Sequence, residues 1–181
     1  MIGGQWKERY DRVPRDIRLF LVRGLIVFVA WQLLYNLLLA PAHTPDRQLT
    51  DVTAYVTMKI ANAVYGHAEM YGHPDRAVIT LYGKKILGIA DPCNALEIYV
   101  LYIAFLFCYP APNKRRLLFV LAGVPMIFML NVVRCSLLLW LNLKHRGWFN
   151  ISHHYIFNTM VYLLVFYLWM QFSKKTTAHD T

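Results

Sequence analysis

Four long segments that are rich in apolar residues and poor in charge determine what this chain can fold into. They cover residues 17–40, 93–109, 117–143 and 154–172. About 20 consecutive apolar residues form a helix that can cross a lipid bilayer, and within lipid only helices and closed barrels satisfy every backbone polar group. We therefore predict an all-α membrane protein with about four transmembrane helices.

The composition of the chain supports a membrane protein. Apolar residues make up 57% of the 181 residues and charged residues only 16%, whereas soluble domains hold about 45–50% apolar and about 25% charged residues. This excess excludes a water-soluble globule, a disordered chain and a small secreted protein held together by disulfides. We expect residues 1–181 to form a single membrane domain.

The net charge of +9 is better explained by a membrane than by nucleic acid. Basic patches do bind nucleic acid, but Lys and Arg beside apolar segments also orient a protein and contact anionic lipid headgroups. Counted from a cytoplasmic N-terminus, the inner segments hold eleven basic residues and the outer segments seven. We predict a multi-pass protein of the cytoplasmic (inner) membrane, with both termini in the cytoplasm, membrane lipids as partners and no nucleic acid.

The first apolar segment is either a cleaved signal peptide or a permanent anchor. Ala40-Pro41-Ala42 resembles a signal-peptidase site. However, the apolar run is longer than that of a signal peptide, and the basic stretch before it is long. The sequence favours an uncleaved anchor.

Residues 41–92 separate the first two apolar segments and form the expected extracytoplasmic loop segment. Leu49–Tyr65 has the spacing of a short amphipathic helix, with an apolar stripe that consists of Val52, Tyr55, Val56, Ile60 and Val64. Ala77–Ala90 has β-branched residues on both arms of a turn at Tyr82–Lys85, which predicts a β-hairpin. This segment could cap the outer membrane surface.

Arg134 is the most costly residue within the apolar segments. It lies eight residues before Asn142, which places it about 12 Å inside the end of the third helix. Arginine in the middle of a membrane helix costs about 2.5–3.5 kcal/mol, so it usually faces a partner or a wet cavity. The alternative is that Arg134 extends its side chain to the membrane surface or pairs with a neighbouring helix. Asn131 lies one turn earlier on the same helix face and is expected to support the same site.

Cys93 follows Asp91-Pro92 at the start of the second apolar segment. Asp is a plausible helix N-cap and Pro favours the first helical position. Cys93 is then expected in the first helical turn, where the helix dipole increases the thiolate fraction. Glu97, one turn later, is expected to be buried and to pair with Arg134. The alternative is that Cys93 has no chemical role, because a lone cysteine is more often a small buried apolar residue.

His153 and His154 precede the fourth apolar segment. A helix N-terminus disfavours the imidazolium ion, which leaves a neutral ring that can accept a proton near pH 7. The alternative is an interfacial histidine that faces lipid headgroups. Because the second helix begins, the third ends and the fourth begins on the same side, Cys93, Arg134 and His154 are expected at one depth, which predicts a single site.

A cysteine, a neutral histidine and a fixed cation are the groups that acyl transfer requires. Cysteine attacks a carbonyl carbon, histidine transfers protons, and the cation stabilises the oxyanion. The thioacyl intermediate then passes to water or to an acceptor. The sequence contains no H-E-x-x-H zinc motif and no C-x-x-C pair. We expect no metal and no cofactor.

At these residues the chain resembles the exosortase/archaeosortase family of membrane-embedded cysteine transpeptidases. The matching motifs are DPCNAL at Asp91–Leu96, NVVR at Asn131–Arg134 and SHHY at Ser152–Tyr155. Cys93-Asn94-Ala95 departs from the usual Cys-Ser-Gly, and the chain is short. It is most similar to the compact Bacteroidetes-type exosortases, in which His-His-Tyr also occurs.

The resemblance implies a thiol protease and transpeptidase for protein sorting. Its partners would be exported proteins whose C-terminal signal consists of a short motif, a transmembrane helix and a basic tail. Cleavage would take place at the outer face of the membrane, with transfer to a surface acceptor. The resemblance also implies that Cys93 is the nucleophile, that Arg134 steadies the oxyanion or substrate, and that His154 is the acid and base, with His153 as the alternative.

Two other functions remain open. A non-catalytic assembly or chaperone subunit of an envelope export system would use its polar residues to hold helices together. A small transporter could line a pathway with Arg134 and Glu97, although about four helices without an inverted repeat disfavour it.

Overall fold

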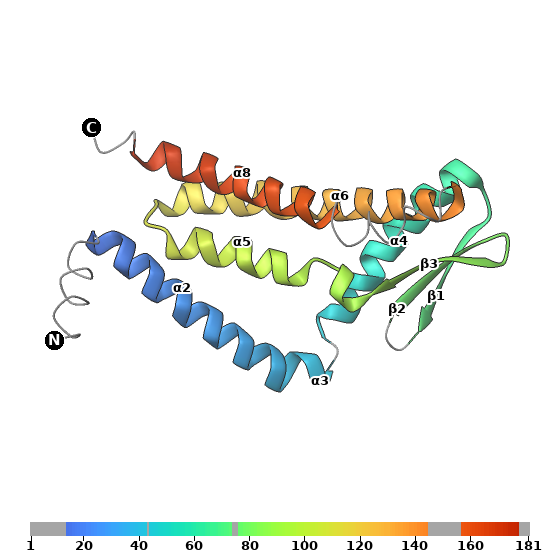
Figure 1. Cartoon of the computed structure of the whole chain (residues 1–181), viewed down its shortest axis with the longest axis horizontal. Coiled ribbons are helices and arrows are strands. Elements are labelled where there is room, and N and C mark those ends of the chain that lie inside the picture. The colour runs from blue at the N-terminus through green and yellow to red at the C-terminus, as the bar shows by residue number, and fades with distance from the viewer. Residues whose placement is uncertain (1–13, 43, 74–75, 145–156, 178–181) are drawn as a thin grey trace, which may run out of the picture.

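The computed structural model describes residues 14–42, 44–73, 76–144 and 157–177. Within these residues the chain is mostly helical. Figure 1 shows α2 (Arg15–Leu34), α5 (Leu96–Cys108), α6 (Asn113–Lys144) and α8 (Phe157–Thr177) with their axes roughly aligned and a small sheet beyond one end of them. We call this end the sheet end. The opposite end, where α2 and α6 begin and α8 ends, contains Arg115, Arg116 and Lys174, and we call it the basic end.

The first apolar segment forms one continuous helical stretch. It consists of α2 (Arg15–Leu34), a π-helical turn η1 (Tyr35–Leu39) and the short α3 (Ala40–Ala42). Residues 15–42 have the length and hydropathy of a membrane span. In the part of the chain that the structure describes, no residue of α2 is buried against other elements, so most of its surface is free to contact lipid.

The other three apolar segments form α5 (Leu96–Cys108), α6 (Asn113–Lys144) and α8 (Phe157–Thr177). A helix is therefore confirmed in each of the four apolar segments. Among the described residues, two stretches have the length and hydropathy of a membrane span by themselves, residues 15–42 and α6, while α5 is a shorter apolar helix.

Helices α5, α6 and α8 pack together around Tyr102. Its side chain is fully buried in an apolar cluster with Ile127, Val165 and Phe172, and its hydroxyl donates a 2.8 Å hydrogen bond to the carbonyl oxygen of Phe119. This close approach requires Gly123, because a Cβ atom there would lie 2.1 Å from the Tyr102 hydroxyl oxygen. A glycine thus sets the distance between α5 and α6.

The loop between the first two apolar segments folds into α4 (Asp46–Tyr65) and three strands. The strands are β1 (Ala68–His73), β2 (Arg76–Leu81) and β3 (Lys84–Ala90), which form an antiparallel sheet in that order. The predicted hairpin is confirmed as β2 and β3. The prediction covered two of the three strands, and β1 was not predicted because its sequence, AEMYGH, contains no β-branched residue.

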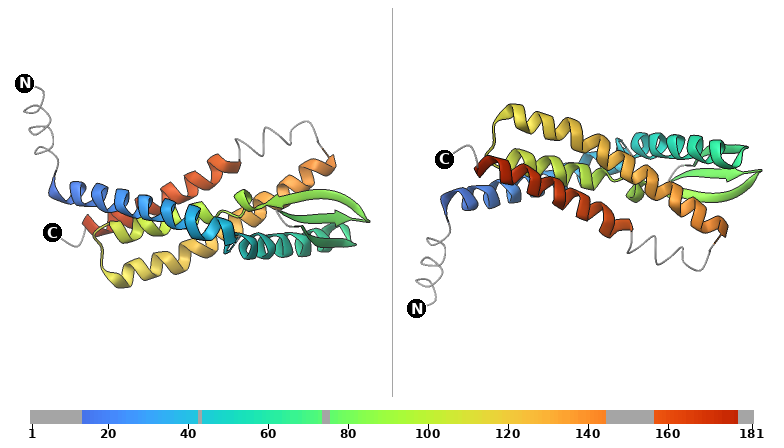
Figure 2. Two further views of the ribbon diagram at one scale, coloured as in Figure 1. Left: turned by 90° about the horizontal axis from the view of Figure 1, so that it is seen from below. Right: turned by 90° about the horizontal axis from the view of Figure 1, so that it is seen from above.

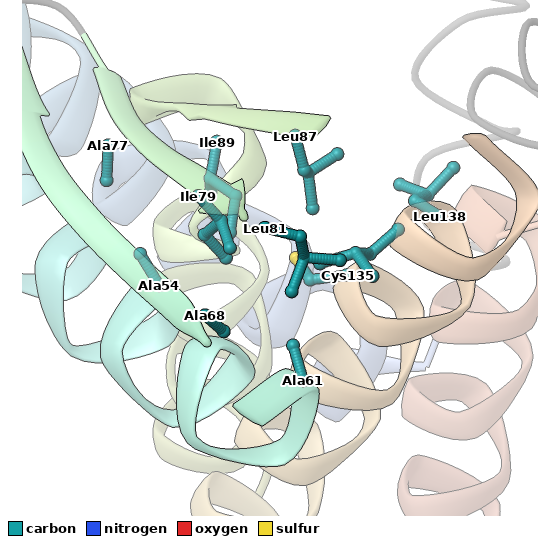
Figure 3. Close-up of a cluster of buried hydrophobic side chains, with 11 residues drawn as sticks. Ala54, Ala61, Ala68, Ala77, Ile79, Leu81, Leu87, Ile89, Cys135 and Leu138 are labelled. Carbon is teal, nitrogen blue, oxygen red and sulfur yellow. The ribbon is translucent and has the colours of Figure 1, made fainter. Parts of the chain in front are cut away.

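The inner face of the sheet packs on α4 and on the last turns of α6, as Figure 3 shows. Ala54 and Ala61 of α4 leave room for the strands, and Cys135 and Leu138 of α6 complete the cluster. The sheet contributes the side chains of Ala77, Ile79, Leu81, Leu87 and Ile89. This cluster joins the sheet and α4 to the helices into one body.

Helix α4 packs through a different face from the one that was predicted. Its buried face carries small residues, namely Thr50, Thr53, Ala54, Thr57 and Ala61. Four residues of the predicted apolar stripe are 40–66% exposed instead, namely Val52, Tyr55, Ile60 and Val64. Small side chains allow the closer approach to the sheet and α6, and the Thr57 hydroxyl is satisfied by the carbonyl oxygen of Thr53 at 2.8 Å.

Candidate active site

Cys93 lies in a tight turn between β3 and α5. Asp91–Cys93 form a 3-10 turn, η2, and Ala95 adopts a left-handed conformation with φ of 67°, so α5 begins only at Leu96. The prediction that Cys93 occupies the first turn of this helix was wrong. The Asn94 side-chain oxygen accepts a 2.8 Å hydrogen bond from the backbone N–H of Leu96. This bond closes a local turn, and the turn delays the start of α5 until Leu96.

A buried polar network fixes this turn to the first turns of α4. The Asn94 side chain is 2% exposed and donates to the side-chain and backbone oxygens of Asp46 at 2.8 and 3.1 Å. The hydroxyl of Thr50 donates to a carboxylate oxygen of Asp91 at 2.8 Å. These residues were not predicted from the sequence, because hydrogen bonds between residues more than 40 positions apart leave no local pattern.

The structure brings Cys93 and Arg134 together. Helix α6 places the Nη2 atom of Arg134 3.9 Å from the Sγ atom of Cys93. One turn earlier, the Asn131 side-chain amide donates a 3.1 Å hydrogen bond to the Cys93 carbonyl oxygen. The two α6 residues lie on one helix face, as the N-x-x-R spacing predicted, and together they contact both the side chain and the backbone of Cys93.

Arg134 and Asn131 are buried and hold unused hydrogen-bonding atoms. Asn131 is fully buried and Arg134 is 7% exposed. Among the described residues, the Arg134 Nε and the Asn131 Oδ1 have no hydrogen-bond partner, and no carboxylate lies within ion-pair distance of Arg134. Buried polar atoms are normally satisfied, so these two atoms of the site require an explanation, which a catalytic role would supply for the Arg134 Nε.

Glu97 is not the buried partner of Arg134 that the sequence predicted. Its side chain is exposed, because the buried side of α5 carries Tyr99, Tyr102 and Leu106. Glu97 lies two residues before Tyr99, which is about 200° around the helix. The prediction was wrong because it placed Glu97 and Arg134 by depth and did not consider the rotation of α5.

A small cavity of about 210 Å³ lies beside Arg134. Its walls include Tyr35 from the π-helical turn η1 and Tyr162 from α8, and π-helical turns often occur at functional sites. Three carboxylates also line it, those of Asp46, Asp91 and Glu97. Polar side chains from six helical elements therefore surround the cavity, namely Tyr35, Asp46, Asp91, Glu97, Arg134 and Tyr162.

The predicted proton-transfer residues, His153 and His154, lie outside the described residues. The described part of the site therefore consists of the Cys93 turn, Asn131, Arg134 and the residues that line the cavity.

Comparison with protein families gives one match that covers most of the chain. The model of the transmembrane exosortase family matches residues 17–175, a range that contains all the described helices except the first two residues of α2 and the last two of α8. No curated protein and no solved structure matches the chain. Members of the family are, in general, membrane enzymes that process protein sorting signals. On the strength of this match, the chain belongs to the transmembrane exosortase family.

Proposed function

We propose that this protein is a membrane-embedded cysteine peptidase and transpeptidase that cleaves the C-terminal sorting signals of exported proteins. One observation carries the proposal, namely the 3.9 Å approach of the Arg134 guanidinium to the Cys93 sulfur. In an exosortase family member, these are the residue types that can attack a carbonyl and stabilise the resulting oxyanion.

The proposed reaction begins at the Cys93 sulfur. The sulfur attacks the carbonyl carbon of the scissile peptide bond, and the carbonyl oxygen gains negative charge. Arg134 donates hydrogen bonds to this oxyanion, and its Nε atom, which has no partner among the described residues, is available for the purpose. Asn131 holds the Cys93 backbone in place.

His154 is proposed to move the protons, with His153 as the alternative. The imidazole accepts the proton of the Cys93 thiol and gives it to the nitrogen of the departing segment. The C–N bond then breaks, which leaves a thioester on Cys93 and releases the C-terminal segment as an amine. Water or a surface acceptor next attacks the thioester carbon, and the free thiol re-forms when the acceptor's proton returns to the sulfur through the histidine.

We also propose four membrane crossings within a single domain formed by residues 1–181. Residues 15–42 and α6 are long enough alone, and α5 and α8 pack along α6 in the same apolar cluster. Arg115, Arg116 and Lys174 gather at the basic end, which we place in the cytoplasm with both termini. Residues 41–92 and the site would then face outward from the inner membrane, and surrounding lipids would contact α2.

The nucleophile is tested with a reporter protein that ends in a candidate motif, a transmembrane helix and a basic tail. Release of its C-terminal segment is followed in membranes that contain Cys93→Ser or Cys135→Ser. Cys135 is a second cysteine, but it is buried in the cluster between the sheet, α4 and α6 and does not line the cavity beside Arg134. We expect Cys93→Ser to abolish release and Cys135→Ser to retain it, with equal amounts of folded protein. Full activity of Cys93→Ser would instead favour a non-catalytic assembly or chaperone subunit.

A further inference from the structure

A second and larger cavity lies between α2, α5 and α8. Its volume is about 520 Å³, and Glu97 is its one charged lining residue among those described. Its walls include Gly24 and Val27 of α2, Leu101 and Ala104 of α5, and Trp169 of α8. We call this cavity the lateral groove. It is an apolar surface at a depth where a membrane protein meets lipid.

The lateral groove is open because α2 contacts α5 mainly at the basic end. There Phe20 packs edge-on against Phe105 and Tyr109, with ring centroids 5.4 and 6.2 Å apart. Towards the sheet end the two helices diverge (Figure 1). A Cβ atom at Gly24 would have no atom of the described chain within 4 Å. The groove therefore has free space along α2.

The lateral groove is continuous with the candidate active site. Glu97, Ile98 and Tyr162 line both this groove and the smaller cavity beside Arg134. The groove extends along α5 to Cys108, eleven residues beyond Glu97, which corresponds to about 16 Å of helix. A molecule in the groove would thus point one of its ends at the Cys93 turn.

Access to Cys93 from the sheet side is restricted. Cys93 packs against the cluster between the sheet, α4 and α6, and its turn is bonded to the first turns of α4. Figure 2 shows from two sides that the sheet and α4 continue beyond the end of α5. Asp91, Pro92, Asn94 and Ala95 of the same turn line the smaller cavity, so among the described residues the groove reaches the turn around Cys93 sideways, through that cavity.

We propose that the lateral groove binds the transmembrane helix of the substrate and so places the scissile bond at Cys93. This inference rests on the proposed function and specifies where its substrate binds. A polypeptide segment within lipid must be helical to satisfy its backbone. Small residues let helices approach each other closely in membranes, and Gly24 and Ala104 provide such residues on the two opposite walls.

The inference is tested by photo-crosslinking in phosphatidylcholine vesicles that contain the full chain. The probe is a single-pass peptide of about 20 Leu and Ala residues with a diazirine side chain at its centre. The protein carries Cys93→Ala, so the test does not depend on turnover. We expect the peptide to label the neighbourhoods of Val27 and Leu101, and to label far less around Leu121, which is exposed on α6 outside the groove.

Two filling variants and a matched control sharpen the test. Gly24→Trp and Ala104→Trp fill the lateral groove and are expected to reduce the labelling about tenfold. Leu25→Trp adds the same ring to an exposed residue of α2 outside the groove and should leave the labelling unchanged. Size-exclusion chromatography in detergent shows whether each variant is folded, and the two filling variants lie on different helices, so a failure of one still leaves the other.

The outcomes separate this inference from the proposed chemistry. Equal labelling at the groove and at Leu121, or unchanged labelling in both filling variants, would overturn the docking site, as expected for a groove that holds only lipid. An active Cys93→Ser variant would overturn the proposed nucleophile without affecting the crosslinks. Labelling at the groove that both filling variants abolish supports the docking site whichever way the nucleophile test turns out.

Discussion

Asn131 and Cys93 are joined by a 3.1 Å hydrogen bond from the side-chain amide of the first to the carbonyl oxygen of the second. Asn131 is fully buried in the middle of an apolar helix, where an unbonded amide N–H would cost about 1–3 kcal/mol. The bond connects two segments that are 38 residues apart. It holds the turn between β3 and α5 against the face of α6 that also carries Arg134.

Loss of this bond should slow the reaction without unfolding the protein. Asn131→Ala leaves the Cys93 carbonyl without its donor, which costs about 1–3 kcal/mol, so we expect the rate of signal release to fall about tenfold or more. The effect should appear in kcat more than in KM, because the substrate is not contacted. Ser136→Ala removes a hydroxyl that, among the described residues, donates to the Val132 carbonyl oxygen of the same helix, and it should change neither value. An unchanged kcat in Asn131→Ala would contradict this role.

Replacement of Arg134 by lysine should not restore activity. Lysine keeps the charge but lacks the planar arrangement of donors that a guanidinium presents, and loss of an oxyanion donor costs about 10²–10³ in kcat. We therefore expect Arg134→Lys to release signal segments at least a hundredfold more slowly, about as slowly as Arg134→Gln. Lys59→Gln, which changes an exposed cation above the ring of Tyr55, serves as the control. Near-normal turnover of Arg134→Lys would show that charge alone suffices.

Ala95 should accept glycine with a gain in stability. Its φ of 67° is unfavourable for an L-residue by about 1–2 kcal/mol, whereas glycine adopts this conformation freely. We expect Ala95→Gly to raise the midpoint of thermal unfolding in detergent. Ala95→Val should lower it, because a β-branched residue is still less compatible with positive φ. A lower midpoint for the glycine variant would contradict the left-handed conformation.

Asn94 should contribute strongly to stability through its bonds to α4. Asn94→Ala leaves the buried Asp46 carboxylate without its 2.8 Å donor, and an unsatisfied buried group costs about 1–3 kcal/mol. The matched control is Asn36→Ala, since Asn36 is exposed and, in the described part of the chain, bonds to Gln32 of the same helical stretch. Thermal unfolding should show a clear loss for Asn94→Ala and almost none for Asn36→Ala. Equal midpoints would mean that the network adds little.

Gly123 should be the least replaceable glycine in the helices. A Cβ atom there would meet the Tyr102 ring at 2.1–2.5 Å, and such overpacking costs about 1–3 kcal/mol. Gly24→Ala makes the same substitution in open space and should be neutral or slightly stabilising, because alanine favours helices more than glycine does. Similar unfolding midpoints for the two variants would show that α5 and α6 can move apart without cost.

Features with a local signal were predictable from the sequence. A helix that faces lipid needs a continuous run of apolar residues, so such runs predicted the helices. The β-branched residues on both arms of the turn predicted the β2–β3 hairpin. The proximity of Cys93 and Arg134 followed from depth, since both lie near the sheet end of their segments. The N-x-x-R spacing also indicated that Asn131 and Arg134 share a face.

Features that depend on which face a helix turns toward its neighbours, or on contacts with residues far along the chain, could not be predicted from local sequence patterns. The exposure of Glu97 depends on where α5 begins, and the packed face of α4 depends on the room that its small residues leave for the sheet. One signal was available for the Cys93 turn. Ala95 occupies the glycine position of the Cys-Ser-Gly motif that Cys93-Asn94-Ala95 resembles, and a glycine at such a position is compatible with a left-handed residue.

The turn around Cys93 has a consequence for how this chain can vary in length. Hydrogen bonds anchor it to α4 on one side and to α6 on the other, so an added or deleted residue between Ala90 and Leu96 would break one anchor or shift the sulfur. The hairpin tip at Tyr82 and Gly83 is exposed and distant from both anchors. Tags and labels introduced there should be tolerated, which makes the tip a practical handle for attaching the protein to a surface or a fluorophore.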